Sequence, residues 1–313
     1  MQFSIIIPAK NEEKNIGRCV DSIQCVKWKR TELEIIVVDN GSSDRTVDIA
    51  RGKGAQVFAR PGVTVSALRN YGASQSKGRV LVFLDADCVV PENWLEEASR
   101  YLERRDVVCF GNPPGIQSNA NWMQRAWYQV RRKEILTGDA EWLESMNMFV
   151  RRESFEAVRG FGEDLVTCED YDLSLRLKQI GRVLFDQRIA AVHLGEAATI
   201  GHFWRKERWR GTSNLKGLSI HGLSRKEAPS LVLPVIHCLC GLAILAGAVI
   251  VITKSGGVHG RYLAFLFLIW QVPLMTLAVW KSRNSGNIFL ALHLYILLNV
   301  YLTARGSAML RHR

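Results

Sequence analysis

Two carboxylates that could bind a metal ion follow one of the most apolar runs in the sequence. Asp85 and Asp87 come directly after residues 80–84, Val-Leu-Val-Phe-Leu. On an extended segment, residues two apart point to the same side, so both carboxylates could face one cation. Hard oxygen ligands favour Mg²⁺ or Mn²⁺, and such ions typically bridge protein carboxylates to phosphate groups. The pattern therefore predicts a divalent-cation site. A solvated turn is the alternative, because acids two apart are common in loops.

A second polar loop, residues 39–44, follows the apolar run 35–38. Its sequence, Asp-Asn-Gly-Ser-Ser-Asp, predicts a tight turn at Asn-Gly and a helix cap at one of the serines. Capping accounts for Ser43 and for Asp44 in the first turn of the helix. It does not account for Asp39, which stands at the end of the expected strand, where it could hydrogen-bond a base or a sugar.

Acidic residues also stand where helices are expected to begin. Residues 8–13 follow the first apolar run, and Glu13 is explained equally well by chemistry or by its interaction with a helix dipole. Glu169 and Asp170 precede the expected helix 171–179, where the same dipole argument applies. An aspartate at that position can still present a free oxygen to a hydroxyl group as a general base.

Strand and helix patterns alternate over the first 200 residues. Strands are expected at residues 3–7, 34–39, 56–59 and 79–85, and helices at 12–23, 45–51, 65–75 and 92–103. Near-continuously apolar strands predict a parallel sheet that is covered by helices on both faces. Ligands of such open α/β sheets bind beyond the carboxyl ends of the strands. The three polar loops lie at those ends.

The distribution of charge divides the chain into a soluble part and a membrane tail. The 313 residues carry a formal net charge of +11, but every Asp and Glu lies within residues 1–227, where the charge is 34 − 30 = +4. The last 86 residues contain seven Lys or Arg and no acid. Lipid selects against buried carboxylates, so this tail is expected in a membrane. A nucleic-acid partner is not expected, because the bases are not gathered on a soluble domain.

Three stretches of the tail contain no Asp, Glu, Lys or Arg: residues 231–253, 262–280 and 287–304. At about 1.5 Å per residue, the first two are long enough to cross a hydrocarbon core of roughly 30 Å. The third stretch includes His293 and Asn299. The sequence leaves open whether this third stretch crosses the membrane fully.

The orientation of the tail is only partly determined by its charges. Seven Lys or Arg lie within residues 205–226, just before the first span, and the positive-inside rule then places the N-terminal domain in the cytoplasm. The seven scattered cysteines suit a reducing compartment, and the N-terminus lacks the features of a signal peptide. We therefore expect an integral protein of the inner or plasma membrane with a cytoplasmic catalytic domain. Three full crossings would place Arg305 outside, against the same rule.

Taken together, the motifs occur in the order and at the spacing of one enzyme family. They are IIIPAKNE (5–12), VVDNGSSD (37–44), RNYG (69–72), FLDAD (83–87), NMFVRR (147–152), GF (160–161) and EDYDLSLRL (169–177). As a set they resemble the family 2 glycosyltransferases over residues 3 to about 195. The resemblance implies a GT-A-like, Rossmann-type α/β fold with an open, mostly parallel sheet and helices on both faces, followed by an α-helical transmembrane tail.

The resemblance also assigns roles to individual residues. The residues implied to line the nucleoside-binding part are Pro8, Glu12, Asp39 and Arg69, with Asp39 on the base. Asp85 would touch the ribose or the metal, Asp87 would hold Mn²⁺ or Mg²⁺ on the diphosphate, and His193 stands where relatives can place a further metal ligand. A lone histidine is more often structural. Asp170, with Glu169 beside it, matches the catalytic base.

The basic stretch 204–211 resembles the Q-x-x-R-W sequence of processive relatives, but Arg205 replaces the glutamine, which places processive synthesis in doubt. An interfacial helix with tryptophan and arginine in the headgroup layer is the alternative. Both descriptions leave one arginine, Arg208, able to reach the leaving diphosphate.

The predicted organisation is a glycosyltransferase domain (1–200), a basic juxtamembrane segment (201–228) and a membrane tail (229–313). A nucleotide half, residues 1–112, and an acceptor half, residues 113–200, divide the first domain. The implied activity is metal-dependent, inverting transfer of a sugar from a nucleotide-diphospho-sugar, with UDP as the expected nucleotide, to a hydroxyl of a lipid-linked or glycan acceptor. A sugar nucleotidyltransferase and a catalytically silent membrane scaffold of the same fold are the alternatives.

Overall fold

The computed structural model describes residues 1–131, 136–212, 228–253, 257–285 and 287–309. They form two compact units, each with its own core. The first unit comprises Met1–Ser118 with Lys133–Glu196, and the second comprises Asn119–Arg132 with Ala197–Arg313. The division along the chain falls near residue 200, and residues 119–132 group with the C-terminal part.

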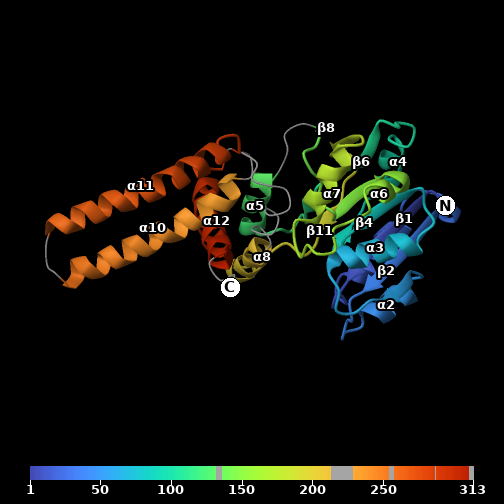
Figure 1. Cartoon of the computed structure of the whole chain (residues 1–313), viewed down its shortest axis with the longest axis horizontal. Helices are drawn as coiled ribbons and strands as arrows, with labels where there is room; N and C mark the ends of the chain where they lie inside the picture. Colours follow the sequence, from blue (N-terminus) through green and yellow to red (C-terminus); the bar gives the residue numbers. More distant parts are fainter. Residues whose placement is uncertain (132–135, 213–227, 254–256, 286, 310–313) are drawn as a thin grey trace. The chain divides into compact units, whose positions relative to one another are not determined.

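An eight-stranded mixed sheet forms the centre of the first unit (Figure 1). Its order is β3 (Gln56–Ala59), β2 (Leu33–Asp39), β1 (Phe3–Ala9), β4 (Val80–Leu84), β9 (Asn147–Arg151), β6 (Val107–Gly111), β10 (Arg182–Asp186) and β8 (Thr137–Asp139). Strands β9 and β8 run antiparallel to their neighbours, and the other pairs are parallel. The mostly parallel sheet that the sequence predicts is therefore confirmed, with an antiparallel β9 that the apolar pattern alone does not distinguish.

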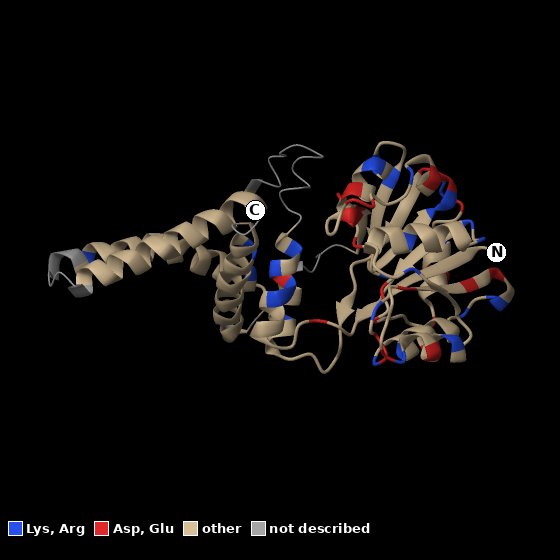
Figure 2. Cartoon of the chain, turned by 60° about the horizontal axis from the view of Figure 1, so that its bottom comes forward, with Lys and Arg blue, Asp and Glu red and all other residues tan. Residues whose placement is uncertain are grey.

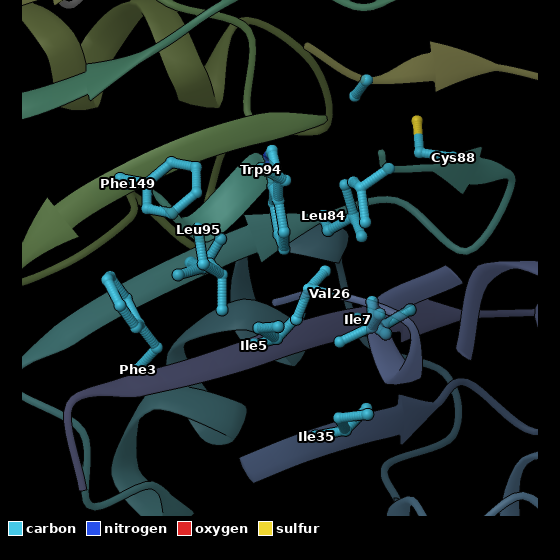
Figure 3. Close-up of a cluster of buried hydrophobic side chains, with 14 of the residues drawn as sticks. Phe3, Ile5, Ile7, Val26, Ile35, Leu84, Cys88, Trp94, Leu95 and Phe149 are labelled. Atoms are coloured by element: carbon cyan, nitrogen blue, oxygen red, sulfur yellow. The ribbon is translucent and has the colours of Figure 1, made fainter. Parts of the chain in front are cut away.

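Helices cover both faces of this sheet, because side chains alternate between the faces along each strand. On one face, Phe3, Ile5 and Ile7 of β1 pack with Trp94 and Leu95 of α4 (Figure 3). The helices of that face are α1 (Ile16–Gln24), α2 (Thr46–Gly52) and α4 (Trp94–Ser99). The opposite face is covered by α3 (Val65–Gln75), α6 (Arg152–Ala157) and α7 (Glu169–Lys178).

A second, three-stranded sheet lies beside the end of β4. Its order is β5 (Cys88–Val89), β11 (Val192–His193) and β7 (Gly115–Ile116). In the antiparallel pairing of β11 with β5, His193 lies opposite Cys88. This pairing brings a histidine from late in the chain next to the carboxylates that follow β4.

The helix expected at residues 12–23 begins later than predicted. The carbonyl of Glu12 accepts hydrogen bonds from the backbone N–H groups of Asn15 and Ile16, so residues 12–15 form a turn and α1 starts at Ile16. The consequence is that Glu12 lies in the loop at the end of β1 rather than on a helix. A short 3₁₀ turn, Arg30–Glu32, leads into β2.

The second unit is helical. It contains α5 (Trp122–Arg131), α8 (Ile200–Gly211), α10 (Ala228–Thr253), α11 (Gly257–Ser282) and α12 (Ile288–Met309). Three stretches, Pro229–Val251, Gly260–Ser282 and Phe289–Met309, are long and apolar enough to cross a membrane. Figure 2 shows how few charges α10 and α11 carry compared with the first unit. Of the predicted basic segment 201–228, residues 213–227 lie outside the described part of the chain.

Candidate active site at the carboxyl edge of the sheet

The loops that follow β1, β2 and β4 lie at one edge of the sheet, because these three strands are parallel. The register pairs Ala9 with Asp39, so the first two loops leave the sheet side by side. Pro8 is the last but one residue of β1 and is half-buried. The edge predicted from the sequence therefore exists, and its polar residues divide into two groups with different surroundings.

The loops after β1 and β2 are joined by hydrogen bonds between them. Asn11, whose φ of +56° places it in the left-handed region, accepts from the backbone N–H of Ser43 at 2.8 Å and donates its own N–H to Ser42 Oγ at 2.9 Å. The N–H of Glu12 donates to Thr46 Oγ1 at 2.7 Å. Asparagine tolerates this conformation better than most residues. The serines and Asn11 thus hold the two loops together.

Asp39 is buried and its carboxylate is bound by its own turn. One oxygen accepts from the N–H groups of Gly41 and Ser42, at 2.9 and 3.0 Å, and the other accepts from the Ser42 hydroxyl. Asp44 acts in the same way, accepting from the N–H of Glu13 and from Thr46. Asp39 and Asp44 therefore accept their hydrogen bonds from groups within the two loops.

The acids near β4 and α7 are instead connected through one buried arginine. Arg69 of α3 is only 3% exposed. Its Nη2 lies 2.8 Å from Asp85 Oδ1, and its Nη1 lies 2.9 Å from Glu169 Oε1. Asp85 follows β4 and Glu169 begins α7, so this guanidinium ties together two motifs that are 84 residues apart in the chain. A fixed arginine fork suits two carboxylates in this arrangement.

Asp87 lies against residues from the end of the first unit. Its Oδ2 is 2.9 Å from His193 Nε2, and the other ring nitrogen, Nδ1, is 3.2 Å from Glu196 Oε1. The backbone of Gly195 approaches so closely that a Cβ there would overlap Asp87 Oδ2. Residues 85–88 form a turn, closed by the Cys88 N–H on the Asp85 carbonyl, rather than the extended segment expected.

The pKa of Glu12 is affected by burial and by Asp85 and Asp87. Burial raises the pKa of its carboxyl group above the usual value, and the negative charges of Asp87 and Asp85 raise it further, whereas a hydrogen bond from Asn15 opposes the shift. Electrostatic influence of this kind requires proximity. Glu12 therefore shares the surroundings of the β4 acids, although it comes from the first strand.

The pKa of Asp170, at the start of α7, is strongly raised. Burial, together with the carboxylates of Glu169 and Glu144, raises its pKa to about 8, while Arg69 opposes the shift. Its Oδ1 accepts from the backbone N–H of Tyr171 at 2.8 Å. The preceding Cys168 has a φ of +67°, an uncommon conformation for this residue type that often marks a functional site.

The predicted site residues are thus distributed unevenly. Asp85, Glu169 and Arg69 are in direct contact, as are Asp87 and His193. Arg208 lies in α8 of the second unit, so its contact with the donor stays a prediction. Single residues in loops carry no periodic pattern, so the sequence does not predict Gly195, Glu196 or Glu144 at this site.

The donor atoms around Asp87 suit a divalent ion only in part. Carboxylate oxygen and imidazole nitrogen are both metal ligands, and Mn²⁺ accepts oxygen-rich sites of this kind. In the described part of the chain, no group of three or more His, Cys, Asp or Glu side chains is arranged to hold a metal ion. Asp87 and His193 therefore supply at most part of a coordination shell, which phosphate oxygens of a substrate and water could complete.

Comparison with known proteins gives a consistent result for the first unit. The family model described as "Glycosyl transferase family 2" matches residues 4–159. The chain is 27% identical over 244 residues to the glycosyltransferase AglE of Haloferax volcanii, covering 74% of this chain and 78% of that protein. It is 29% identical over 194 residues to a beta-monoglucosyldiacylglycerol synthase of Synechocystis, covering 56% of this chain but only 40% of that protein.

Solved structures show the same fold. The mannosyltransferase PcManGT of Pyrobaculum calidifontis, in complex with GDP-Man and Mn²⁺, superposes with a TM-score of 0.68 at 18% identity, covering 99% of this chain and 86% of that one. TarS of S. aureus (residues 1–349) in complex with UDP-GlcNAc gives a TM-score of 0.52 at 16% identity, covering 98% and 90%. At these identities the likeness concerns the fold.

Proposed function

This chain belongs to glycosyl transferase family 2, and from that premise we propose that it transfers a sugar from a nucleotide-diphospho-sugar to a hydroxyl group of an acceptor, with inversion at the anomeric carbon. The observation that carries the proposal is the Arg69 bridge between Asp85 and Glu169. It joins the end of β4, where the donor is expected to bind, to the start of α7, where the base is expected.

The donor would bind along the carboxyl edge of β1, β2 and β4. Solved structures of the same fold hold GDP-Man or UDP-GlcNAc, which supports a nucleotide-sugar donor. We assign the nucleoside-binding part to Pro8, Glu12, Asp39 and Arg69. Since Asp39 Oδ atoms already accept from their own turn, Asp39 would contact the base only with its remaining acceptor capacity.

A divalent ion, Mn²⁺ or Mg²⁺, would be held by Asp87 and His193 with Asp85 nearby, and when bound it supplies positive charge next to the departing diphosphate. The close backbone approach at Gly195 fixes the position of the Asp87 carboxylate. Glu196 Oε1 lies 3.2 Å from Nδ1 of His193, and its negative charge would favour the ring orientation in which Nε2 faces Asp87. Arg208 would contribute further positive charge to the diphosphate.

Asp170 would act as the general base. In a single displacement, the acceptor oxygen bonds to the anomeric carbon as the bond to the diphosphate oxygen breaks, and Asp170 takes the hydroxyl proton. A pKa of about 8 makes this carboxylate basic enough to take a proton near neutral pH. Arg69 holds Glu169 in place beside it and limits the rise in the Asp170 pKa.

The acceptor is proposed to be lipid-linked or a membrane-delivered glycan. Three helices of the chain are long and apolar enough to cross a membrane, and they follow the catalytic unit in the sequence after α8. One relative is a beta-monoglucosyldiacylglycerol synthase, which is consistent with an acceptor at a membrane. We place the catalytic unit on the cytoplasmic side because seven bases precede the first span.

The test is product analysis with the full chain in lipid nanodiscs. The protein is incubated with a panel of UDP- and GDP-sugars, Mn²⁺ or Mg²⁺ and a lipid extract, and products are identified by mass spectrometry and by the anomeric configuration from NMR. We expect transfer that is abolished by a chelator and strongly reduced by Asp170→Asn. Release of pyrophosphate from a nucleoside triphosphate and a sugar phosphate would instead identify a nucleotidyltransferase. No turnover with any donor would favour the silent scaffold.

A further inference from the structure

The three apolar helices of the second unit differ in how much of their surface is covered by protein. In the apolar windows of α10 and α11, 11% of the residues are buried, compared with 39% in α12. Leu245 of α10 is 65% exposed and Phe265 of α11 is 60% exposed, as expected for side chains that face lipid. In α12, by contrast, Leu294 and Leu297 are fully buried. The third helix therefore has much less surface left for lipid.

In the described part of the chain, the contacts of α12 with the α10–α11 hairpin lie in the half where α10 begins and α11 ends. Its first half packs on the last part of α11, where Tyr295 Oη donates to Gln271 Oε1 at 2.8 Å and Leu294 packs with Ala278. Its second half meets the first part of α10, where a Cβ at Gly306 would collide with Pro234. A spanning helix that ran beside the hairpin would contact each partner along its length. Because the first half of α12 contacts α11 and its second half contacts α10, α12 crosses the hairpin near its base.

The same arrangement is visible from two directions. In Figures 1 and 2, α10 and α11 run together as a long hairpin, and α12 lies across the end where α10 begins and α11 ends. On its other side α12 packs against α5 and α8, through a cluster that includes Trp127 and Phe203. Among the described residues, Leu245 and Phe265 in the far half of the hairpin lie outside this cluster and are largely exposed.

Charged groups lie where α12 meets α8. Glu207 of α8 is 1% exposed, and its two oxygens lie 2.8 Å from Arg210 Nη1 and 3.2 Å from Arg305 Nε. Arg305 also stacks on the Tyr301 ring, with its guanidinium carbon 4.7 Å from the ring centroid. Arginine in the centre of a bilayer is energetically costly. This charge network is therefore expected at the level of the headgroups.

From these contacts we infer that α12 does not cross the membrane. The α10–α11 hairpin is the membrane-spanning element, and α12 lies in the headgroup layer with α5 and α8. Each helix of the hairpin has 26 residues, about 39 Å of helix, which is enough for a hydrocarbon core of roughly 30 Å. The partner of the α8 surface is the bilayer itself: exposed Trp209 and Arg205 suit an interface of anionic headgroups.

Two crossings in place of three change the predicted sidedness of the C-terminal arginines. In the described part of the chain, no candidate span precedes α10, so α8 and the catalytic unit lie on one side of the membrane. Arg305, paired with Glu207 of α8, lies on that same side. The conflict with the positive-inside rule that three crossings produce is thereby removed. The inference does not depend on the catalytic activity.

Reporter fusions to the full chain test the number of crossings. GFP, which fluoresces only in the cytoplasm, and alkaline phosphatase, which is active only outside, are each fused before Met1 and after Arg313 and expressed in bacteria. Two crossings predict that both ends report the same side. If the two ends report opposite sides, an odd number of crossings is established and the inference is wrong.

A depth measurement tests where α12 lies. A nitroxide amino acid is placed by codon suppression at Leu292, at Ser307 and, as a control in the hydrocarbon core, at Leu245, and membrane depth is obtained from collisions with oxygen and a nickel chelate. Leu292 and Ser307 are 15 residues apart, about 22 Å along a helix axis. We expect equal, shallow depths for these two positions and a deep position for Leu245. A difference of about 20 Å between Leu292 and Ser307 would show that α12 spans the membrane.

Discussion

Two parts of the same sheet edge treat their carboxylates differently. At the ends of β1 and β2, Asp39 and Asp44 each accept three hydrogen bonds from groups within the two loops. At the end of β4 and the start of α7, Asp85 and Glu169 share one buried arginine, and the pKa of Asp170 is raised by burial and by its acidic neighbours. The first group holds loops in shape, whereas the second group stores unfavourable charge that a substrate or a cation can relieve.

This difference predicts which substitutions affect activity and which affect folding. A carboxylate that is fully engaged by its own loop contributes to stability and has little capacity left for a ligand. A carboxylate that is held close to other acids gives up stability, and such groups concentrate at functional sites. The following variants separate the two groups, beginning with the largest expected effect.

Asp170→Asn is expected to lower kcat by roughly 10²–10⁴, the usual contribution of a general base. The donor should still bind, because the donor side of the site keeps Arg69, Asp85 and Asp87. The measurement is transfer to acceptor together with donor binding by calorimetry, on full-chain protein.

Asp172→Asn is the matched control on the same helix. Asp172 is buried and accepts from Arg176, which also donates to the carbonyl groups of Val158 and Gly160. Its loss should cost about 1–3 kcal/mol of stability with little change in kcat. If Asp172→Asn removed activity as completely as Asp170→Asn, the distinction between the two acids would be lost.

Gly195→Ala tests whether the exact placement of Asp87 matters. The added methyl group would overlap Asp87 Oδ2, so the carboxylate must move while remaining present. In Gly195→Ala we expect the affinity for the divalent cation to fall about 10- to 100-fold, as for other changes that disturb a metal ligand. Asp87→Ala, which removes the carboxylate altogether, is expected to abolish transfer. Mn²⁺ titration of donor binding and of turnover measures both. Unchanged cation dependence in Gly195→Ala would show that Asp87 does not hold the ion.

Much of this edge could be predicted from the sequence, because strand ends and motif order determine which loops meet. Apolar runs located β1, β2, β3 and β4 within a few residues, and the loops after them gather at one edge as predicted. Fold class follows from the same pattern. The same pattern does not predict which polar residues perform chemistry. The hydrogen bonds that engage a carboxylate can come from another loop, and no local sequence pattern indicates them.

Several motif residues serve packing rather than chemistry. A Cβ at Gly72 would collide with Ile6, so this glycine lets α3 lie close to β1. Asn70 exchanges two hydrogen bonds with the backbone of Phe161. Asn147 donates to the carbonyl groups of Asn112 and Ile189 and accepts from Trp94. Side-chain identity and spacing cannot distinguish such residues from ligands. The His193–Asp87 contact likewise depends on the pairing of β11 with β5. Strands of two residues are too short to be predicted from the sequence.

The pKa of Asp170 predicts a pH dependence of stability. A carboxyl group with a folded pKa of about 8 and an ordinary unfolded pKa near 4 stabilises the fold below pH 4, and this contribution is lost as the pH rises to 8. The wild type should therefore lose stability between pH 5 and pH 9 relative to Asp170→Asn. Denaturant titrations at both pH values measure the difference. Parallel pH profiles for the two proteins would contradict the shifted pKa.

The same shift predicts the pH profile of transfer. The base must be ionised, so kcat should rise with pH up to about 8. A divalent cation bound at Asp87 favours the ionised form of nearby acids. Raising the Mn²⁺ concentration should therefore shift the rise of kcat to lower pH. If the rise of kcat with pH did not change with the Mn²⁺ concentration, the cation would not influence the pKa of Asp170.

Asp39→Asn should change stability and activity least. It tests the part of the edge where the loops after β1 and β2 bind the carboxylates. The amide oxygen can still accept from the N–H groups of Gly41 and Ser42, while the amide nitrogen can donate to the Ser42 hydroxyl, so the turn keeps its three bonds. We expect a stability loss of about 1 kcal/mol or less, and a rise in the KM for the donor with kcat unchanged if Asp39 also contacts the base. Unfolding and donor kinetics with two different nucleotides measure these effects. A large loss of kcat would show that Asp39 belongs with the β4 and α7 acids, because hydrogen bonds that the variant retains cannot explain it.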